Sequence, residues 1–599
     1  MFQILHRDGL GRIGELVVNN RKITTPALLP VVHPFMKDPW IQIIKELGFE
    51  GIITNSYILY KRRFNGIDIH DHLGFNGLIM TDSGTFQDYV YGGIDATNSQ
   101  MVSYQEMIKS DIITIRDVFS LPEDSWEEVN NGVNETYNRA IEAFKLTDKY
   151  LALPIQGGRF PDLRAKSARL MGSLNNEYFP IGGIVPLMES YNYSSVVEAI
   201  IISKMNLKTN AVIHAFGAGH PMFFSLLVLS GADVFDSSAY IKYARDGRIL
   251  TNEGTVELNY VSEELPQSAI LDKYTLKELK GMDESERTLI IAKHNLYISL
   301  NEIKRIKEEI RQENLWNYTE YRIRAHPLLL EAYRKLLTFY DYLEKFESRS
   351  KRSPVFYTGE ETFLRPLIKR VVEKEGKMQD GIQINKKPYS FYLGPVDTII
   401  KTPFGNFSIY LDETYPIAQS VFPGEYYEKE FKEEIIKSEE WKDFLIRKAN
   451  YIFRYQFSIP LSDIVDLDEI QIRISKNTGK LRNIYLNDKL LFSLRAEDGL
   501  FTLAYEGAKL LHQKLERPKQ RVFVSKEISS FLEEGKNLFS KFVINVDDSL
   551  RPGDEVIVVD EEDQFITFGR AILSPEEMKD FKYGVAVKNR IKSKDLEKD

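Results

Sequence analysis

The chain contains no cysteine among its 599 residues. This absence excludes disulfides, thiolate catalysis, iron–sulfur clusters and cysteine-ligated zinc. A chain of this length can bury several hydrophobic cores, so it needs no disulfide or metal for stability. At about 150 residues per domain, the length predicts roughly four folding units.

Long apolar segments are also lacking. The N-terminus carries Arg7 and Asp8 without an apolar run, so no signal peptide is predicted. The longest apolar stretch without Asp, Glu, Lys or Arg that suggests a membrane span, 209–232, contains two histidines, three glycines and Pro221. It is too broken for a lipid-spanning helix. We therefore expect a cytoplasmic protein with no membrane partner.

Positive charge is in deficit, with a net charge of −9 at pH 7. This excludes a uniformly basic surface, although nucleic acid remains a possible partner because local basic patches make the phosphate contacts. Hydrophobic residues make up 43% and charged residues 28% of the chain, as in a globular protein and unlike a disordered one.

Short apolar runs alternate with amphipathic segments through the first 240 residues. Helical patterns such as 126–149 and 193–205 lie between several of the runs. This order is typical of parallel βα units, and the number of runs favours a closed (β/α)8 barrel over an open sheet. The runs are 51–55, 77–80, 111–115, 151–155, 179–185, 211–216 and 232–235.

After about residue 275 the pattern changes. The sequence predicts an α/β chain in which a barrel with a helical extension, 1–345, is followed by smaller α+β domains at 346–445 and 446–517. Short strands and turns after Pro518 predict a compact β-rich module at 518–599.

Polar or glycine-rich clusters follow nearly every apolar run, where a barrel assembles its active site. Asp82 and Asp236 each follow an apolar run and precede small residues. Two carboxylates that face one bond suit glycosidic chemistry, in which one attacks the anomeric carbon and the other moves a proton. The alternative is that either aspartate caps the next helix.

Other residues at these strand ends suit a flat ligand. Gln156 offers a donor and an acceptor to the edge of a purine-like base, Asp117 could accept its paired N–H groups, and Phe86 could stack on it. Gly157 and Gly183 allow the backbone to approach closely. Tight turns, a helix cap and core packing are the alternatives. The nine histidines show no pair with metal-ligand spacing.

An ordered set of motifs runs along the chain: TDSGTFQ (81–87), LPIQGGRFPDLR (153–164), IGGIVPL (181–187), HAFGAGHP (214–221), VFDSSAYIKYARDGRILTNEGT (234–255), ERTLIIAKHNL (286–296) and ETYPIAQS (413–420). This set resembles the archaeal tRNA-guanine transglycosylases, also called archaeosine tRNA-ribosyltransferases. From Arg521 to about Lys594 the chain is similar to a PUA domain.

The resemblance implies a base exchange in tRNA. Asp236 matches the nucleophile that attacks ribose C1′ and expels guanine, and Asp82 matches the general acid/base that deprotonates the incoming base. The implied incoming base is 7-cyano-7-deazaguanine, inserted at position 15 of the D-arm in archaeosine biosynthesis, and a homodimer is expected. The implied substrate-binding residues are Ser83, Phe86, Asp117, Gln156, Gly157, Gly183 and Val185.

The chain departs from this family in one respect. Members carry a structural zinc held by three cysteines and a histidine, whereas the equivalent stretch, 258–279, has no cysteine, and only His294 keeps a ligand position. One imidazole cannot build a tetrahedral site, so we expect no cofactor and no zinc. Apolar side chains are expected to pack in its place, namely Val261, Leu265, Ile270 and Leu271.

The PUA-like module is expected to contact tRNA phosphates through late positive charges, with a lysine-rich solvated tail as the alternative. These are Lys588, Arg590, Lys592 and Lys594. An archaeosine-synthase-like paralogue is a further alternative, but its signature pairs a Lys-Pro-Tyr with a cysteine, and here Lys387-Pro388-Tyr389 has none. A non-catalytic tRNA-binding relative stays open, and a retaining glycoside hydrolase would leave the module unexplained.

Overall fold

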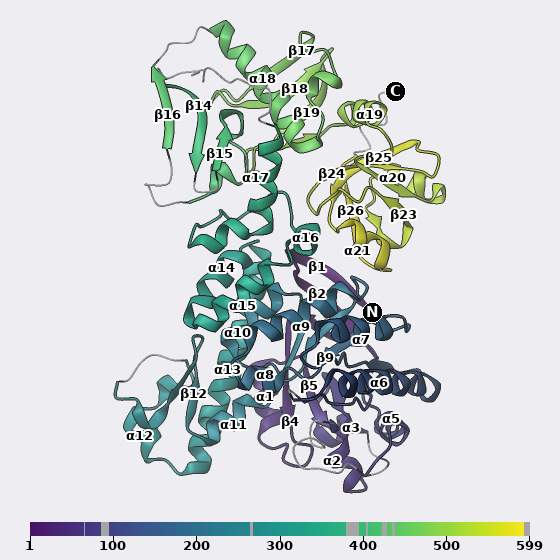
Figure 1. Ribbon diagram of the computed structural model, residues 1–599, viewed down its shortest axis with the longest axis vertical. Helices are drawn as coiled ribbons and strands as arrows, with labels where there is room; N and C mark the ends of the chain where they lie inside the picture. Colours follow the sequence, from purple (N-terminus) through teal and green to yellow (C-terminus); the bar gives the residue numbers. More distant parts are fainter. Residues whose placement is uncertain are drawn as a thin grey trace. The chain divides into compact units, whose positions relative to one another are not determined.

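The computed structural model describes residues 1–64, 66, 68–85, 95–121, 123–263, 268–378, 395–402, 405–421, 428–433 and 438–591. The chain forms two compact units, Met1–Phe339 and Tyr340–Asp599, each described by itself below (Figure 1). The finer domain boundaries expected from the sequence stay predictions.

Eight parallel strands close a barrel in the first unit, which confirms the predicted (β/α)8 fold. Seven of them coincide with the apolar runs of the sequence, and β4 does not, because Pro30 within it argues against a strand. β4 closes the barrel by pairing with β11, with Leu29 opposite Asp236. The strands are β4 (Ala27–Val32), β5 (Gly51–Asn55), β6 (Leu78–Asp82), β7 (Ile112–Thr114), β8 (Tyr150–Ala152), β9 (Tyr178–Ile181), β10 (Val212–Ala215) and β11 (Val234–Ser237).

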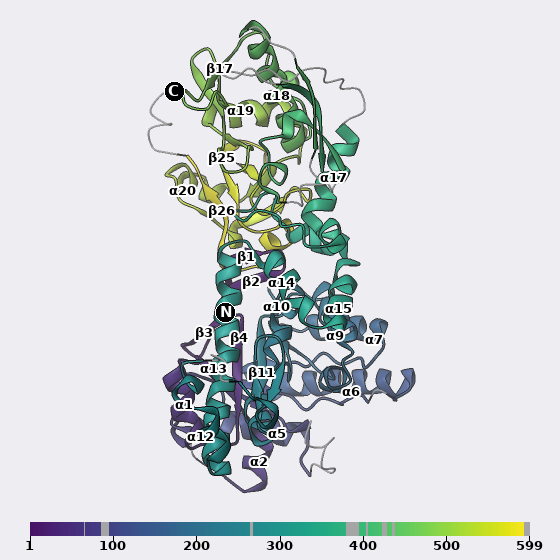
Figure 2. The same cartoon turned by 90° about the vertical axis from the view of Figure 1, so that its left-hand side faces the viewer.

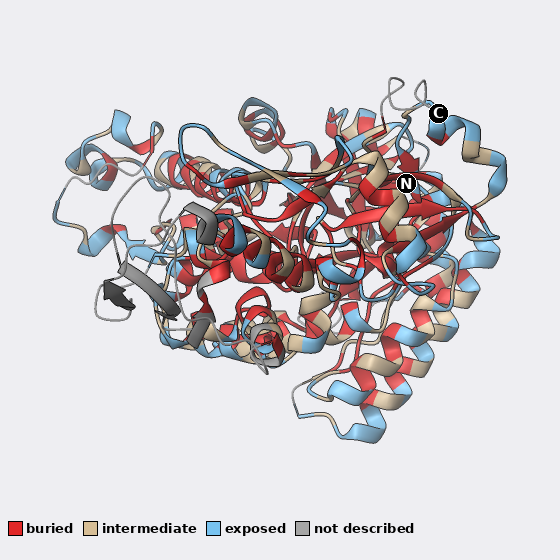
Figure 3. Cartoon of the chain, turned by 90° about the horizontal axis from the view of Figure 1, so that it is seen from above, coloured by how far each residue is buried: buried red, intermediate tan, exposed pale blue. Residues whose placement is uncertain are grey.

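Helices cover the barrel on the outside. Two of them match the helical patterns of the sequence, α6 (Trp126–Leu146) and α9 (Tyr193–Met205). A capping box fixes the start of α6, in which Ser125 and Glu128 satisfy each other's backbone N–H groups. The strands are buried almost throughout, while the helices alternate buried and exposed faces (Figure 3), as expected for a barrel with a filled interior.

An N-terminal antiparallel sheet, which the sequence analysis did not predict, precedes the barrel. It comprises β1 (Phe2–Asp8), β2 (Gly11–Val18) and β3 (Arg21–Thr25). The long helix α13 (Glu284–Arg311) lies along β4 and contacts β1 and β2 (Figure 2). From β2, Arg12 donates two hydrogen bonds to Asp233, at 2.7 and 2.8 Å, in a fully buried ion pair. This pair fixes the residue that precedes β11.

The second unit is α+β and ends in a β-rich module, as predicted. It contains a three-stranded, a four-stranded and a six-stranded sheet. The strands of the six-stranded sheet are β21 (Arg521–Val524), β22 (Leu538–Phe539), β23 (Val543–Val546), β24 (Glu555–Val559), β25 (Phe565–Ala571) and β26 (Val585–Asn589). Across the described ranges of both units, no helix is long and apolar enough to cross a membrane.

Candidate active site

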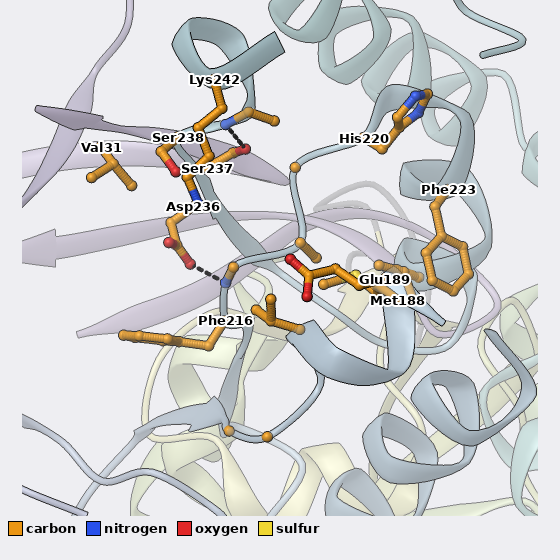
Figure 4. A pocket seen from close by; sticks show the side chains of 18 of the residues that line it. Val31, Met188, Glu189, Phe216, His220, Phe223, Asp236, Ser237, Ser238 and Lys242 are labelled. Carbon is orange, nitrogen blue, oxygen red and sulfur yellow. Dashed lines mark hydrogen bonds between the residues drawn. The ribbon is translucent and has the colours of Figure 1, made fainter. Parts of the chain in front are cut away.

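A cavity of about 1170 Å³ opens at the carboxyl ends of the barrel strands. Its walls come from the ends of these strands and the loops that follow them (Figure 4). The structure brings together six of the residues that the sequence analysis singled out at this edge. They are Asp82, Asp117, Gln156, Gly183, Val185 and Asp236.

Asp236, the third residue of β11, is held through one oxygen. Its Oδ1 accepts hydrogen bonds from the backbone N–H of Gly217 at 2.6 Å and from Nε2 of His214 at 2.9 Å. Its Oδ2 accepts no hydrogen bond from any of the described residues. This arrangement fixes the carboxylate and leaves one oxygen available for bond formation.

His214 is itself held by a hydrogen bond at its other ring nitrogen. The imidazole is fully buried on β10, and its Nδ1 lies 3.0 Å from the hydroxyl of Tyr178 on β9. A carboxylate only accepts, so Nε2 carries the hydrogen and, in the neutral ring, Nδ1 accepts from the Tyr178 hydroxyl. The sequence analysis assigned no role to either residue. The available signal was a histidine inside the apolar run 211–216.

Asp82, the last residue of β6, has a different environment. Asn55 donates to its Oδ2 at 3.1 Å, and the backbone N–H of Gly84 also donates to it. Burial, with the nearby negative charges of Asp117 and Asp236, raises the pKa of Asp82 to about 7 against these hydrogen bonds. A carboxyl group with a pKa near neutrality can both donate and accept a proton during a reaction.

Gln156 and Asp117 form a polar wall of the cavity. Nε2 of Gln156 donates to Oδ2 of Asp117, and Thr85 makes a further side-chain hydrogen bond to Asp117, whose pKa is raised by burial. Oε1 of Gln156 is buried and has no hydrogen-bond partner among the described residues. An unpaired buried acceptor costs about 1–3 kcal/mol, so this atom suits a ligand N–H. A Cβ on Gly182 would lie 2.2 Å from Nε2 of Gln156, so a larger residue there would displace the Gln156 amide.

A buried arginine that the sequence analysis did not identify supports this wall. Arg164 on α7 (Pro161–Gly172) donates from Nη1 to the carbonyl groups of Ile155 and Gly182, at 2.7 and 2.9 Å. Its Nη2 donates to the carbonyl of Gly158 at 3.1 Å. Arg164 therefore ties together the segments that follow β8 and β9. Its burial lowers the pKa of the guanidinium to about 10.

Two predicted binding residues, Ser83 and Gly157, do not line the cavity. Ser83 is buried with its Oγ 3.2 Å from Oγ1 of Thr85, and it does not line the cavity. Gly157 packs behind the wall, where a Cβ would lie 2.5 Å from the backbone nitrogen of Arg164. Phe86 lies outside the described residues. Their roles in binding stay predictions.

The residues around His294 do not fit a zinc ion. Nε2 of His294 donates to the carbonyl of Leu250 at 2.9 Å, and Nδ1 lies 2.8 Å from the hydroxyl of Ser268. Both ring nitrogens are thus engaged, and no group of three possible ligands occurs in the described part of the chain. Leu271 is buried nearby as expected, Val261 and Ile270 are half-buried, and Leu265 lies outside the described residues.

The predicted phosphate-binding residues of the C-terminal module are described in part. Lys588 on β26 is exposed, and Arg590 pairs at 2.8 Å with the fully buried Glu555. Lys592 and Lys594 lie outside the described residues, as does Lys387-Pro388-Tyr389.

Comparisons with known proteins agree with this architecture. A family profile described as queuine tRNA-ribosyltransferase matches residues 8–328. A patch-forming domain C2 of tRNA-guanine transglycosylase matches residues 447–518, and a PUA domain matches 520–592. The tRNA-guanine(15) transglycosylase of Methanocaldococcus jannaschii is 39% identical, over 98% of this chain and 99% of its own length. Its counterparts in Methanococcus aeolicus and Pyrococcus abyssi are each 40% identical, over 98% of this chain and 99% and 97% of their own lengths.

Proposed function

Because the chain belongs to the archaeal-type tRNA-guanine(15) transglycosylase family of pentosyltransferases, we propose that it exchanges guanine 15 of tRNA for 7-cyano-7-deazaguanine, a step in archaeosine biosynthesis. One observation carries the mechanism. Asp236 and Asp82 face the same cavity from two strand ends, each held by protein donors in a different way. The difference assigns them different chemical roles.

The first half of the reaction expels guanine. Oδ2 of Asp236 attacks ribose C1′, a C1′–Oδ2 bond forms, and the C1′–N9 bond breaks with its electron pair moving to N9. N9 takes the proton from the neutral carboxyl group of Asp82, and guanine leaves. The N–H groups of His214 and Gly217 stay on Oδ1 throughout and keep the carboxyl group in place.

The second half installs the new base. The Asp82 carboxylate takes the N9 proton of 7-cyano-7-deazaguanine, and N9 then attacks C1′ and displaces Asp236. Two displacements at one carbon retain its configuration. Gln156 presents a buried acceptor to the polar edge of the base, and Val185 lines the cavity near its 7-substituent in this proposal.

Incorporation of labelled 7-cyano-7-deazaguanine into a tRNA transcript tests the proposal. We expect labelling of a transcript with guanosine at position 15 and none of a matched transcript with adenosine there. Absence of exchange of either guanine or 7-cyano-7-deazaguanine by folded protein that still binds tRNA would instead indicate a non-catalytic relative.

We further propose that the module at 520–592 binds tRNA phosphates with Lys588, Arg590, Lys592 and Lys594. Removing one charge that binds a phosphate should flatten the log–log dependence of tRNA affinity on salt by roughly 0.7–0.9. Lys588→Ala should do so without changing the affinity for the free base, and an unchanged salt slope would contradict a phosphate-binding role for Lys588. The expected homodimer stays a prediction, which sedimentation velocity would test.

A further inference from the structure

The cavity extends beyond the residues that the exchange reaction uses. At about 1170 Å³ it exceeds the roughly 300–1,000 Å³ typical of sites for a single small ligand. Figure 4 shows His220 and Phe223 across the cavity from Asp236, with Met188 and Glu189 between them. We call this part the aromatic arm, and its lining rings are Tyr191, Tyr193, His220, Phe223, Tyr243 and His326.

Three of these rings, those of Tyr191, Tyr193 and His326, form a fixed platform. Tyr191 follows α8 (Val185–Glu189) and stacks on His326 with ring centroids 5.7 Å apart and planes 5° from parallel. Tyr193 meets His326 edge-on at 5.8 Å. His326 caps α15 (Pro327–Leu337) by accepting from the backbone N–H of Leu328 at 3.2 Å. The imidazole that covers one face of Tyr191 is therefore held in place.

Folding alone does not account for a tyrosine at position 191. The residue is 55% exposed, so more than half of its surface gains nothing from burial. Its backbone φ of 58° lies in the left-handed region, which favours glycine or asparagine and costs a bulky residue free energy. An exposed aromatic ring in strained backbone at the edge of a catalytic cavity points to a ligand for its open face.

The charges around the arm favour a base over a phosphate. Lys242 and Arg248 line the cavity, but so do Glu189 and Glu253. These opposite charges do not make a concentrated anion site. The feature specific to the arm is an aromatic face, and every nucleobase has a π-face that can stack on it.

We propose that the open face of Tyr191 stacks on a tRNA base adjacent to the exchanged guanosine. This inference rests on the proposed function, which supplies tRNA as substrate. A guanosine in a base stack must be extruded to reach the catalytic cavity, and its extrusion leaves a neighbouring base with an uncovered face. Stacking on Tyr191 covers that face again.

The protein side of the test compares Tyr191→Leu with Tyr191→Phe. Leucine keeps a bulky side chain in the same strained backbone but removes the aromatic face, and it should weaken tRNA binding about 5- to 150-fold. Phenylalanine should stay within about twofold of wild type, because stacking needs the ring and not the hydroxyl. Tyr321→Leu, at a 67% exposed tyrosine that does not line the cavity, is the matched control. The KM for 7-cyano-7-deazaguanine should not change.

The RNA side uses tRNAs with an abasic nucleotide directly 5′ or 3′ of the target. One of the two abasic tRNAs should bind the wild-type protein as weakly as intact tRNA binds the Tyr191→Leu variant. The Tyr191→Leu substitution should not weaken the binding of that abasic tRNA any further. The inference is overturned if Tyr191→Leu binds intact tRNA like wild type, or if it weakens both abasic tRNAs as much as the intact one. These are binding measurements, so a wild-type protein that binds tRNA without exchanging bases would refute the proposed function and not this stacking interaction.

Discussion

Asp236 and Asp82 face one cavity but are held in opposite ways. Asp236 receives two donors on a single oxygen, from His214 and from the backbone of Gly217, so its second oxygen is open to the cavity. Asp82 accepts hydrogen bonds from Asn55 and Gly84, but its burial and the nearby carboxylates of Asp117 and Asp236 raise its pKa to about 7. The comparison teaches that similar side chains at equivalent strand ends acquire different chemistry from their neighbours.

The largest effect should come from removing the open oxygen. Asp236→Asn keeps the size of the side chain but replaces a nucleophilic oxygen with a weak one, so exchange should fall by at least about 10³-fold. Affinity for tRNA should change only a few-fold. Incorporation of labelled base measures the first effect and filter binding the second. More than a tenth of wild-type turnover would remove Asp236 from the role of nucleophile.

A smaller effect is expected behind the nucleophile. His214→Leu removes a donor to Oδ1, and the misplaced carboxylate should form the tRNA adduct about 10²-fold more slowly in a single turnover. Tyr178→Phe should slow it less, because His214 remains. The KM for tRNA should be unchanged in both variants.

The conservative variant His214→Gln separates positioning from folding. Its side-chain amide can donate to Oδ1, so it should recover part of the rate that His214→Leu loses. Equal rates in the Leu and Gln variants, at normal melting temperature, would show that the hydrogen bond to Oδ1 has no part in catalysis.

The Asp82 side can be tested by stability against pH. The folded pKa of about 7 lies above the ordinary value of 3.8 for an exposed aspartate, so the folded state binds this proton more tightly than the unfolded state. The resulting stability is present in full below about pH 4 and is lost as the pH rises towards 7. Asp82→Asn should therefore raise the melting temperature of the protein more at pH 8 than at pH 5, as calorimetry would measure. Equal shifts at the two pH values would contradict the raised pKa.

The smallest effect, none at all, is expected from chelation. Protein groups donate hydrogen bonds to both carboxylates, and the His294 nitrogens are engaged by Ser268 and Leu250. Elemental analysis should find well under one zinc per chain, and EDTA should leave exchange and melting temperature unchanged. Stoichiometric zinc in the purified protein would show that a metal site remains.

Ser268→Ala should instead cost about 1–3 kcal/mol of stability, because it removes the hydroxyl partner of the buried His294.

Sequence patterns predicted much of the barrel, because strands buried on both faces read as apolar runs. They missed β4, where Pro30 interrupts the pattern, and the N-terminal sheet of β1 to β3. Asp82, Asp117, Gln156 and Asp236 were identifiable because each follows an apolar run.

The supporting residues of the site were not predictable in this way. His214 and Asp236 are 22 positions apart in the chain, and Tyr178 and His214 are 36 apart. Arg164 reaches partners up to 18 positions away. Such interactions depend on strand order and register, which no local pattern encodes. The stacking of Tyr191 on His326 was likewise not predictable, because a different part of the chain supplies His326.

Peptide mapping of the covalent adduct tests the central claim most directly. Wild-type protein is incubated with tRNA without a replacement base, denatured, treated with ribonuclease and protease, and analysed by mass spectrometry. The account predicts one adduct, a ribose phosphate without its base joined through C1′ to Asp236, which is absent from the Asp236→Asn variant. An adduct on Asp82, or on any residue other than Asp236, would contradict it.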